Sequence, residues 1–258
     1  MTDAQKKFDK LVAIMARLRA RDGCPWDIEQ THKSLRQYLL EEAYEVIEAI
    51  DRNDFEHLKG ELGDLLLQVV FHAQIAAEEK HFTIKDVINS ITEKLIRRHP
   101  HVFSDAKIET SAEQTVAWEK TKMTKEGKKS AIDGVPPLLP ALLRAHRMQG
   151  KAAAVGFDWK TVTPVWEKFE EEVQELKEAV ALGDESRVEE ELGDLLFTIV
   201  NISRFLKTNP EDALRRTIAK FERRFKQVEQ SFAAQGRFIG DATLEEMDEI
   251  WDAVKAKE

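Results

Sequence analysis

The sequence is poor in several residue types, and each shortage excludes a class of structure. A single cysteine, Cys24, in 258 residues leaves no partner for an intramolecular disulfide and too few thiolates for a zinc cluster, and it suits a reducing compartment. Glycine (11), proline (7) and tyrosine (2) are scarce, whereas glutamate, lysine, alanine and leucine are plentiful. This mixture is typical of helical globular proteins, so we expect an all-α fold.

Long hydrophobic runs are also missing. No apolar stretch approaches the ~18 residues that a membrane span needs, and the N-terminal segment, residues 1–23, reads as an amphipathic helix rather than a secretory signal. The formal net charge of -9 disfavours nucleic-acid binding through bulk charge and favours a small substrate held by local cations. We therefore expect a cytoplasmic protein that binds neither membrane nor nucleic acid.

The chain contains two copies of one unit. With an offset of 130 positions, EEAYEVIEAI (41–50) aligns with EEVQELKEAV (171–180), and GELGDLLLQVV (60–70) aligns with EELGDLLFTIV (190–200). CPWD resembles GFDW with a slip of one residue, and KLIRRH pairs with KFERRF further along each copy. The pattern predicts two tandem helical-bundle repeats.

Each copy is predicted to hold two antiparallel helices joined by a short turn. Their expected bounds are about Ser34 to Asp51 and Phe55 to Glu79 in the first copy, and about Pro164 to Leu182 and Ser186 to Lys207 in the second. The prolines and lysines between the copies predict a linker over residues 121–155 with a short helix from Pro140 to Gly150. The domains are then 1–120 and 156–258.

Four acids in each copy occur at helical spacings of three. In the first copy Glu42 precedes Glu45 and Glu61 precedes Asp64, and residues three apart share a helix face. Both pairs lie roughly 10 Å from the turn along antiparallel helices, so the four carboxylates converge. The second copy repeats the set at the same spacings: Glu172, Glu175, Glu191 and Asp194.

Converging, half-buried carboxylates need protons, basic partners or a metal ion. Oxygen-only ligation suits a hard cation such as Mg²⁺ or Mn²⁺, and Mg²⁺ usually shares its shell with substrate phosphates. The alternative is that an acidic helical protein produces such spacings by chance. The complete set recurs with an identical separation of 16 residues between Glu45 and Glu61 and between Glu175 and Glu191, which argues against chance.

A glycine stands inside each ELGDLL segment, where it weakens a helix by about 1 kcal/mol relative to alanine. Gly63 and Gly193 lie on the face opposite the acids, and the first of these helices is apolar nearly all round. We interpret both glycines as packing positions that let another helix come close, including a helix of a second subunit.

At these residues the sequence closely resembles the MazG family of nucleoside triphosphate pyrophosphohydrolases, within the all-α NTP pyrophosphatase superfamily. The resemblance covers essentially the whole chain in its two-repeat form and includes CPWD, QTHKSL, both EExxE and ELGDLL sets, KFERRF and the tryptophan near the C-terminus. It implies hydrolysis of NTPs and dNTPs of any base to the monophosphate and pyrophosphate. It also implies dependence on Mg²⁺ and a homodimer.

The resemblance implies that activity lies mainly in the C-terminal copy. We hypothesise from the apolar second helix around Gly63 that the N-terminal copy is structural or dimerising. The implied metal ligands are Glu172, Glu175, Glu191 and Asp194, with Glu42, Glu45, Glu61 and Asp64 as a second, weaker candidate set. The implied nucleotide contacts are Lys168, Arg187, Glu190, Lys220, Arg224 and Trp251. Trp251 either stacks on the base or covers the core.

One difference between the copies supports this division from the residues themselves. Lys168 lies four residues before Glu172, where an ammonium group reaches toward a bound phosphate, and the first copy has Tyr38 in its place. Lys220 and Arg224 of KFERRF do have counterparts in KLIRRH, namely Lys94 and Arg98. A second, weak nucleotide site in the first copy therefore stays open.

The expected reaction is attack of water at the α-phosphorus with pyrophosphate as the leaving group. The expected catalytic residues are Glu171, Glu172 and Glu175, with Glu171 or Glu175 taking the proton of the water. Two other functions stay open. One is a narrow pyrophosphohydrolase for phosphoribosyl-ATP or one pyrimidine dNTP, and the other is a non-catalytic helical dimer that binds metal structurally and acts as a regulatory partner.

Overall fold

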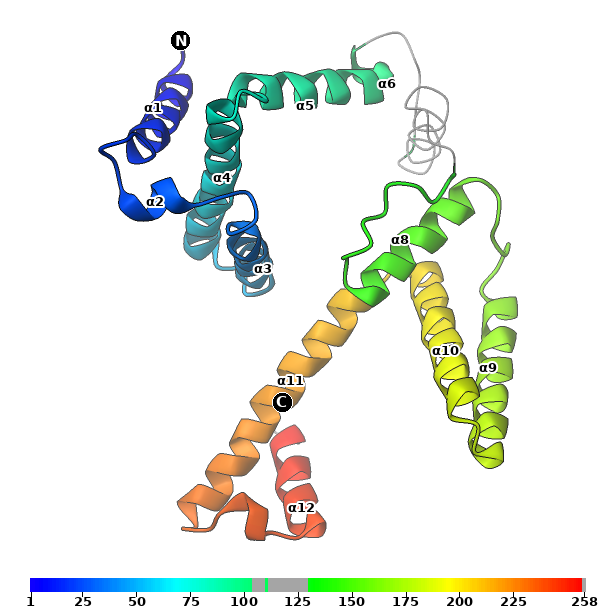
Figure 1. Cartoon of the computed structure of the whole chain (residues 1–258). Coiled ribbons are helices and arrows are strands. Elements are labelled where there is room, and N and C mark those ends of the chain that lie inside the picture. The colour runs from blue at the N-terminus through cyan, green and yellow to red at the C-terminus, as the bar shows by residue number, and fades with distance from the viewer. Residues whose placement is uncertain (104–109, 111–129, 257–258) are drawn as a thin grey trace. The chain divides into compact units, whose positions relative to one another are not determined.

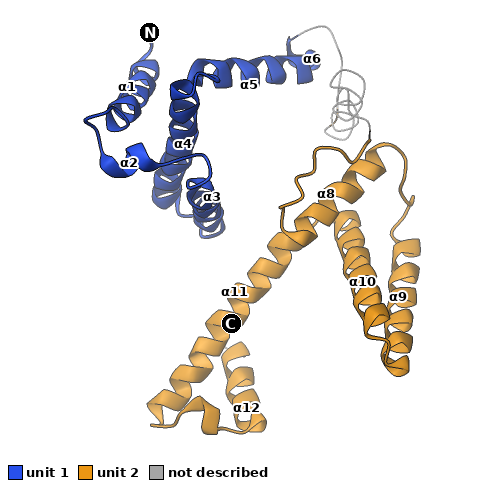
Figure 2. Cartoon of the chain, in the orientation of Figure 1, with its two compact units in different colours: residues 1–107 blue, residues 108–258 orange. Residues whose placement is uncertain are grey.

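The computed structural model describes residues 1–103, 110 and 130–256 of the chain. It divides into two compact units, Met1–Lys107 (unit 1) and Ile108–Glu258 (unit 2) (Figure 2). The described residues form helices and no strand, which confirms the predicted all-α fold. Within that part of the chain, no helix combines the length and the hydrophobicity that crossing a lipid bilayer requires.

Unit 1 is built around a pair of long helices that pack against each other (Figure 1). Its described helices are α1 (Asp3–Leu18), α2 (Pro25–Glu29), α3 (Arg36–Asp51), α4 (Phe55–Glu78), α5 (Ile84–Arg98) and α6 (Pro100–Phe103). The central pair, α3 and α4, begins and ends within two residues of the predicted bounds. The core cluster comes from α1, α3 and α4 and contains Met15, Leu35, Val70, Phe71 and Ile75.

A short turn fixes how α3 and α4 face each other. Asn53 has a left-handed φ of 53°, which reverses the chain. Asp54 then caps α4 by accepting a hydrogen bond from the backbone N–H of His57 at 3.0 Å. The backbone N–H of Asp54 also donates to the carbonyl of buried Ala49 at 3.0 Å, so the turn is tied to the end of α3.

Unit 2 repeats the helix pair with the same turn. Its described helices are α8 (Ala141–Ala154), α9 (Thr163–Leu182), α10 (Glu185–Phe205), α11 (Pro210–Ala234), the 3₁₀ helix η1 (Ile239–Asp241) and α12 (Leu244–Lys255). Gly183, with a φ of 68°, takes the left-handed position, and Asp184 caps α10 through the N–H of Arg187 at 3.1 Å. The two turns therefore place the acids of both repeats at the same distance from the helix ends.

Part of the predicted linker is a structural element of unit 2. The expected short helix forms as α8, but it packs against α10 and α11, and its Gln149 and Lys151 are buried. In unit 1 the corresponding place beside the long helix is taken by α1, which packs against α4. Unit 2 therefore begins before residue 156, and α8 is the first helix of the second repeat. The predicted boundary between residues 120 and 121 lies outside the described residues.

The long helix α11 packs against α8 near its start and extends away from it (Figure 1). Figure 1 shows α11 leaving α8, with α12 folded back along its far half. Val228 and Phe232 of α11 and Val254 of α12 are buried where the helices are joined. Among the described elements, neither α11 nor α12 makes a substantial contact with α9 or α10.

Candidate metal and nucleotide site

Three carboxylates come together between α9 and α10. Glu172 and Glu175 extend from α9 and Glu191 from α10, and one oxygen of each lies within 4.8 Å of the others. Glu172 is 4% exposed and Glu191 8% exposed, so this cluster lies largely out of water. Asp194, the fourth predicted ligand, is exposed and lies outside this close group in the described chain, although it lines the same cavity as Glu172.

Two cations of unit 2 balance this negative charge. The Lys168 ammonium lies 2.8 Å from an oxygen of Glu171 and 2.8 Å from an oxygen of Glu172. The Arg187 guanidinium lies 3.2 Å from Glu191. Hydrogen bonds to Glu171 and Glu172 raise the pKa of Lys168 above its ordinary value, so this side chain stays charged.

Glu175 has no such partner in its immediate environment. Burial and then repulsion from the Glu191 carboxylate raise the pKa of Glu175, while Lys168 opposes the rise. Three carboxylate oxygens this close together form the donor set that a hard divalent cation prefers. The cluster therefore fits Mg²⁺ or Mn²⁺ chemically.

A cavity of about 470 Å³ opens beside the cluster. Lys168, Glu172 and Asp194 line its acidic end. Away from the acids its walls come from α8, from the segment before α9 and from α10, and they include Met148, Gln149, Ala152, Phe157, Trp159, Phe197, Thr198 and Asn201. The volume is within the range of small-molecule sites, and the lining combines apolar walls with a few buried polar groups.

Unit 1 has a carboxylate cluster at the positions that correspond to the cluster of unit 2. Oxygens of Glu42, Glu45 and Glu61 lie within 4.8 Å of one another, as in unit 2. Burial, followed by repulsion from Asp64 and the neighbouring glutamates, raises the pKa of Glu42. Burial and the Glu45 carboxylate likewise raise the pKa of Glu61, which lies 3.3 Å from the His57 ring. A second weak metal site therefore remains a prediction.

None of the prominent cavities found among the described residues is lined by the clustered acids of unit 1. Tyr38 takes the place of Lys168, and Phe71 takes the place of Asn201. Phe71 is 3% exposed in the core cluster, and Tyr38 packs against that cluster. The Trp26 ring lies edge-on to both, with centroids 5.9 Å from Tyr38 and 6.4 Å from Phe71. Aromatic side chains thus fill the place where unit 2 has its cavity lining.

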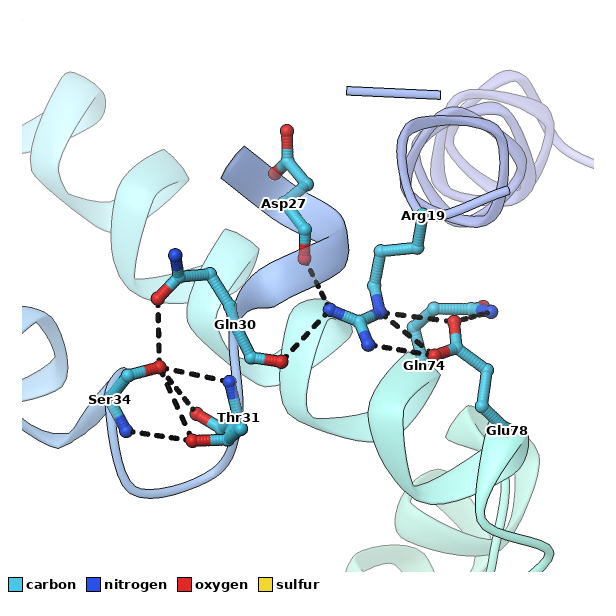
Figure 3. Close-up of polar contacts among 7 residues, drawn as sticks. All are labelled: Arg19, Asp27, Gln30, Thr31, Ser34, Gln74 and Glu78. Carbon is cyan, nitrogen blue, oxygen red and sulfur yellow. Dashed lines mark hydrogen bonds and ion pairs between the residues drawn. The ribbon is translucent and has the colours of Figure 1, made fainter. Parts of the chain in front are cut away.

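Arg19, whose side chain is 7% exposed, lies beside Phe71, and Figure 3 shows its polar contacts with Asp27, Gln30 and Glu78. The Arg19 guanidinium lies 5.5 Å from the centre of the Phe71 ring. It donates to the carbonyl oxygens of Asp27 and Gln30 and forms a 2.8 Å ion pair with Glu78. Arg19 thereby connects the ends of α1 and α2 to α4, and with the offset of 130 its counterpart in unit 2 is Gln149.

The predicted nucleotide contacts fall into two groups. Lys168 and Arg187 lie at the acid cluster, and Glu190 is exposed on α10 next to Glu191. Lys220, Arg224 and Trp251 lie on α11 and α12, away from substantial contact with α9 and α10. A single chain therefore does not bring the two groups together through its helix packing.

Trp251 packs within the pair of α11 and α12. Its ring lies 5.4 Å from that of Phe221, and the Arg224 guanidinium lies 5.7 Å from its centre. The sequence predicts that Trp251 either stacks on the base or covers the core. These contacts correspond to the second role, in which the tryptophan covers apolar residues. Stacking on a base stays a prediction.

The two ELGDLL glycines have no close neighbour in the described chain. A Cβ built on Gly63 or Gly193 would meet no atom within 4 Å. Around them Leu62, Leu66 and Leu192 are between 40% and 50% exposed. No described residue packs closely on these glycines, and their role at a subunit interface stays a prediction.

Sequence reasoning missed the residues that line the inner part of the cavity. Gln149 was assigned to the linker, and neither Asn201 nor Trp159 was singled out. The available signal was the offset of 130 itself, which pairs Asn201 with an apolar Phe71 and Gln149 with a charged Arg19. These two positions differ in chemistry between the repeats although the helices around them are duplicated. The difference indicates that the space beside the acids has a different role in each unit.

Comparisons with known proteins give the same match in both repeats. The family described as MazG nucleotide pyrophosphohydrolase domain matches residues 30–103 and 161–229. A Thermotoga maritima protein named nucleoside triphosphate pyrophosphohydrolase/pyrophosphatase MazG is 51% identical over 257 residues, covering 99% of this chain and 98% of that protein. An Escherichia coli K12 protein named nucleoside triphosphate pyrophosphohydrolase is 48% identical over 98% of both chains. The uncharacterized Bacillus subtilis protein YabN is 46% identical, with 52% of its length covered.

Removing Lys168 should destabilise unit 2 in a pH-dependent way. In Lys168→Met the pKa of Glu175 rises further, so the folded state holds a proton that the unfolded state releases near pH 4.5. The stability deficit relative to wild type should therefore be small at pH 5 and grow toward pH 8. The deficit should stay modest even at pH 8, because water reaches the 36% exposed lysine side chain.

Urea unfolding at the two pH values measures this difference without added metal. Lys177→Met serves as the matched control, because Lys177 is exposed on the same helix. A deficit in Lys168→Met that stays constant with pH, or one that Lys177→Met shares, would contradict the electrostatic role of Lys168.

Proposed function

The chain belongs to the MazG nucleotide pyrophosphohydrolase family, and from this premise we propose that it hydrolyses nucleoside triphosphates, ATP among them, to the monophosphate and pyrophosphate. The reaction takes place in unit 2. The observation that carries this assignment is the cavity of about 470 Å³ whose acidic end is lined by Lys168, Glu172 and Asp194. It supplies a carboxylate cluster, a cation and space for a nucleoside in one place.

The metal ion in this proposal is Mg²⁺, with Mn²⁺ as a substitute. Glu172, Glu175 and Glu191 are close enough to share one ion, and Asp194 joins them from the cavity wall by a change of side-chain rotamer. When bound, Mg²⁺ supplies neutralisation of the polyphosphate charge and of the charge that develops on the pyrophosphate leaving group.

The cations of the site position the substrate. Lys168 pairs with Glu171 and Glu172, and its ammonium group would also reach the polyphosphate of a bound nucleotide. Arg187, next to Glu191, contributes a second positive charge at the same end of the site. Both side chains then bind phosphate oxygens and hold the α-phosphorus near the acids.

A carboxylate of α9 accepts the proton of the attacking water. The oxygen of water bonds to the α-phosphorus, the bond from that phosphorus to the bridging oxygen breaks, and pyrophosphate leaves. Glu175 suits the proton-accepting role because burial and the Glu191 carboxylate raise its pKa above the ordinary value of a glutamate. Glu171, which is 55% exposed and paired with Lys168, is the alternative acceptor.

Unit 1 serves as a scaffold in this proposal. Its acids lack the lysine of unit 2, and Tyr38 and Phe71 occupy the place of the nucleotide. Broad base specificity is also proposed. The cavity walls are mainly apolar and aromatic, which favours any flat ring and gives little discrimination between bases of similar shape.

The working form is proposed to be a homodimer. Apolar residues around Gly193, among them Leu192, Leu196 and Ile199, are exposed on α10. Such a surface is commonly covered by a second subunit. A second copy that covers it would also bring Lys220, Arg224 and Trp251 of α11 and α12 to the phosphate end of the site.

The catalytic assignment predicts different effects of the same substitution in the two units. Glu175→Ala should lower the rate of pyrophosphate release from ATP by at least about 100-fold, because a ligand and the proton acceptor are lost together. Glu45→Ala removes the equivalent side chain of unit 1 and should change the rate by less than about twofold. Loss of activity in Glu45→Ala with full activity in Glu175→Ala would reverse the assignment of the working unit.

The dimer proposal predicts rescue between two inactive variants. Lys220→Ala and Glu175→Ala are each expected to be inactive alone. When they are co-expressed, half of the dimers are mixed, and each mixed dimer carries one intact site if a site takes residues from both chains. The recovered activity is then about one quarter of the wild-type value.

The rate of pyrophosphate release by the purified mixture measures this rescue. Co-expression of Glu175→Ala with Glu172→Ala is the control, because both substitutions fall on the same helix and leave no intact site. Activity of the first mixture at the level of its separate components would contradict a shared site.

A further inference from the structure

Two buried amide side chains line the cavity of unit 2, and one of them has a buried acceptor without a hydrogen-bond partner among the described residues. Gln149 and Asn201 are each 8% exposed, and both line the cavity beside the acids. The Oε1 atom of Gln149 is buried without a partner. A buried polar group without a partner is unfavourable, so its presence on a cavity wall indicates a ligand that completes the hydrogen bonds.

The orientation of each amide is fixed by a neighbour. The Nε2 group of Gln149 donates to the backbone carbonyl of Phe197 at 2.8 Å, which leaves Oε1 as a free acceptor. The Oδ1 atom of Asn201 accepts from Arg204 at 2.9 Å, which leaves its Nδ2 group as the donor. Arg204 is itself held by Asp158 at 2.8 Å, so these two residues act as positioning residues for Asn201.

Unit 1 has no such pair at the same positions. The counterparts of Gln149 and Asn201 are Arg19 and Phe71, and the arginine guanidinium lies 5.5 Å from the centre of the phenylalanine ring. Phe71 belongs to the core cluster of unit 1, and the Arg19 side chain is 7% exposed and paired with Glu78. The Gln149 acceptor and the Asn201 donor at these positions are therefore not required by the helix packing that the two repeats share.

We propose that Gln149 and Asn201 form the base-recognition site of unit 2, in which one fixed acceptor and one fixed donor bind the edge of a nucleobase. The proposal rests on the proposed function, because the acids and Lys168 place the phosphates at the other end of the same cavity. The ring lies between apolar and aromatic walls that include Phe157 and Trp159.

This arrangement explains how one site accepts many bases. The Watson–Crick edge of adenine, guanine, cytosine or uracil carries at least one donor and one acceptor. Each of these bases can therefore engage the fixed acceptor and the fixed donor. Adenine and cytosine present the two groups in the reverse order to guanine and uracil, so the two classes bind in different in-plane positions. Apolar rings of the same size, which lack these groups, leave both amides unsatisfied and bind weakly.

Calorimetric binding to the full-length protein in the presence of Mg²⁺ tests the assignment. The probes are adenosine monophosphate and uridine monophosphate, which carry a base, and pyrophosphate, which does not. In Gln149→Met and in Asn201→Leu we expect the dissociation constants of both monophosphates to rise about tenfold or more. The dissociation constant of pyrophosphate should change by less than about twofold, because the phosphate end of the site is intact.

Two variants are used because either substitution alone could disturb folding, and the melting temperature of each is measured alongside. Gln174→Met is the matched control, since Gln174 is exposed on α9 and bonds only to Glu178 among the described residues. Unchanged monophosphate binding in both variants, or equal weakening of pyrophosphate, would overturn the proposal. Failure of the proposed function is a separate result, namely no pyrophosphate release from ATP by the wild-type protein.

Discussion

The structure depends on a constraint that both repeats share, which is that three carboxylates are held together between two antiparallel helices. Their mutual repulsion and their burial raise the pKa of Glu42 and Glu61 in unit 1 and of Glu175 in unit 2. Such a cluster costs folding free energy unless cations balance it. The Asp-capped turns after α3 and α9 keep the acids in register despite this cost, because they fix where the following helix begins.

The two repeats balance this charge in different ways, and the difference accounts for their different proposed uses. Unit 2 places Lys168 and Arg187 against its acids and leaves a cavity beside them. Unit 1 has His57 beside Glu61, and Phe71 with the Arg19 guanidinium above it closes the neighbouring space. The duplicated helix pair thus adjoins packed aromatic residues in one copy and a cavity in the other.

Much of the fold could be predicted because it is encoded locally. The periods of apolar residues and the turn residues Asn53 and Gly183 place all four central helices within two residues of their observed bounds. The convergence of the acids followed from the same periods. The role of α8 and the amides of Gln149 and Asn201 could not be predicted in this way, because their meaning depends on which helices pack together across long separations in sequence. The exposed position of Asp194 also required the structure, since a spacing of three defines a helix face but not how far each side chain reaches.

The central claim is that only the acid cluster of unit 2 works as a nucleotide site, because only that cluster adjoins an open cavity with a lysine. The most direct measurement is the stoichiometry with which a non-hydrolysable α,β-imido nucleoside triphosphate binds to the protein in the presence of Mg²⁺. The account predicts one bound nucleotide per chain. Two equivalent bound nucleotides per chain would contradict it, because the acids of unit 1 would then bind substrate despite the aromatic residues beside them.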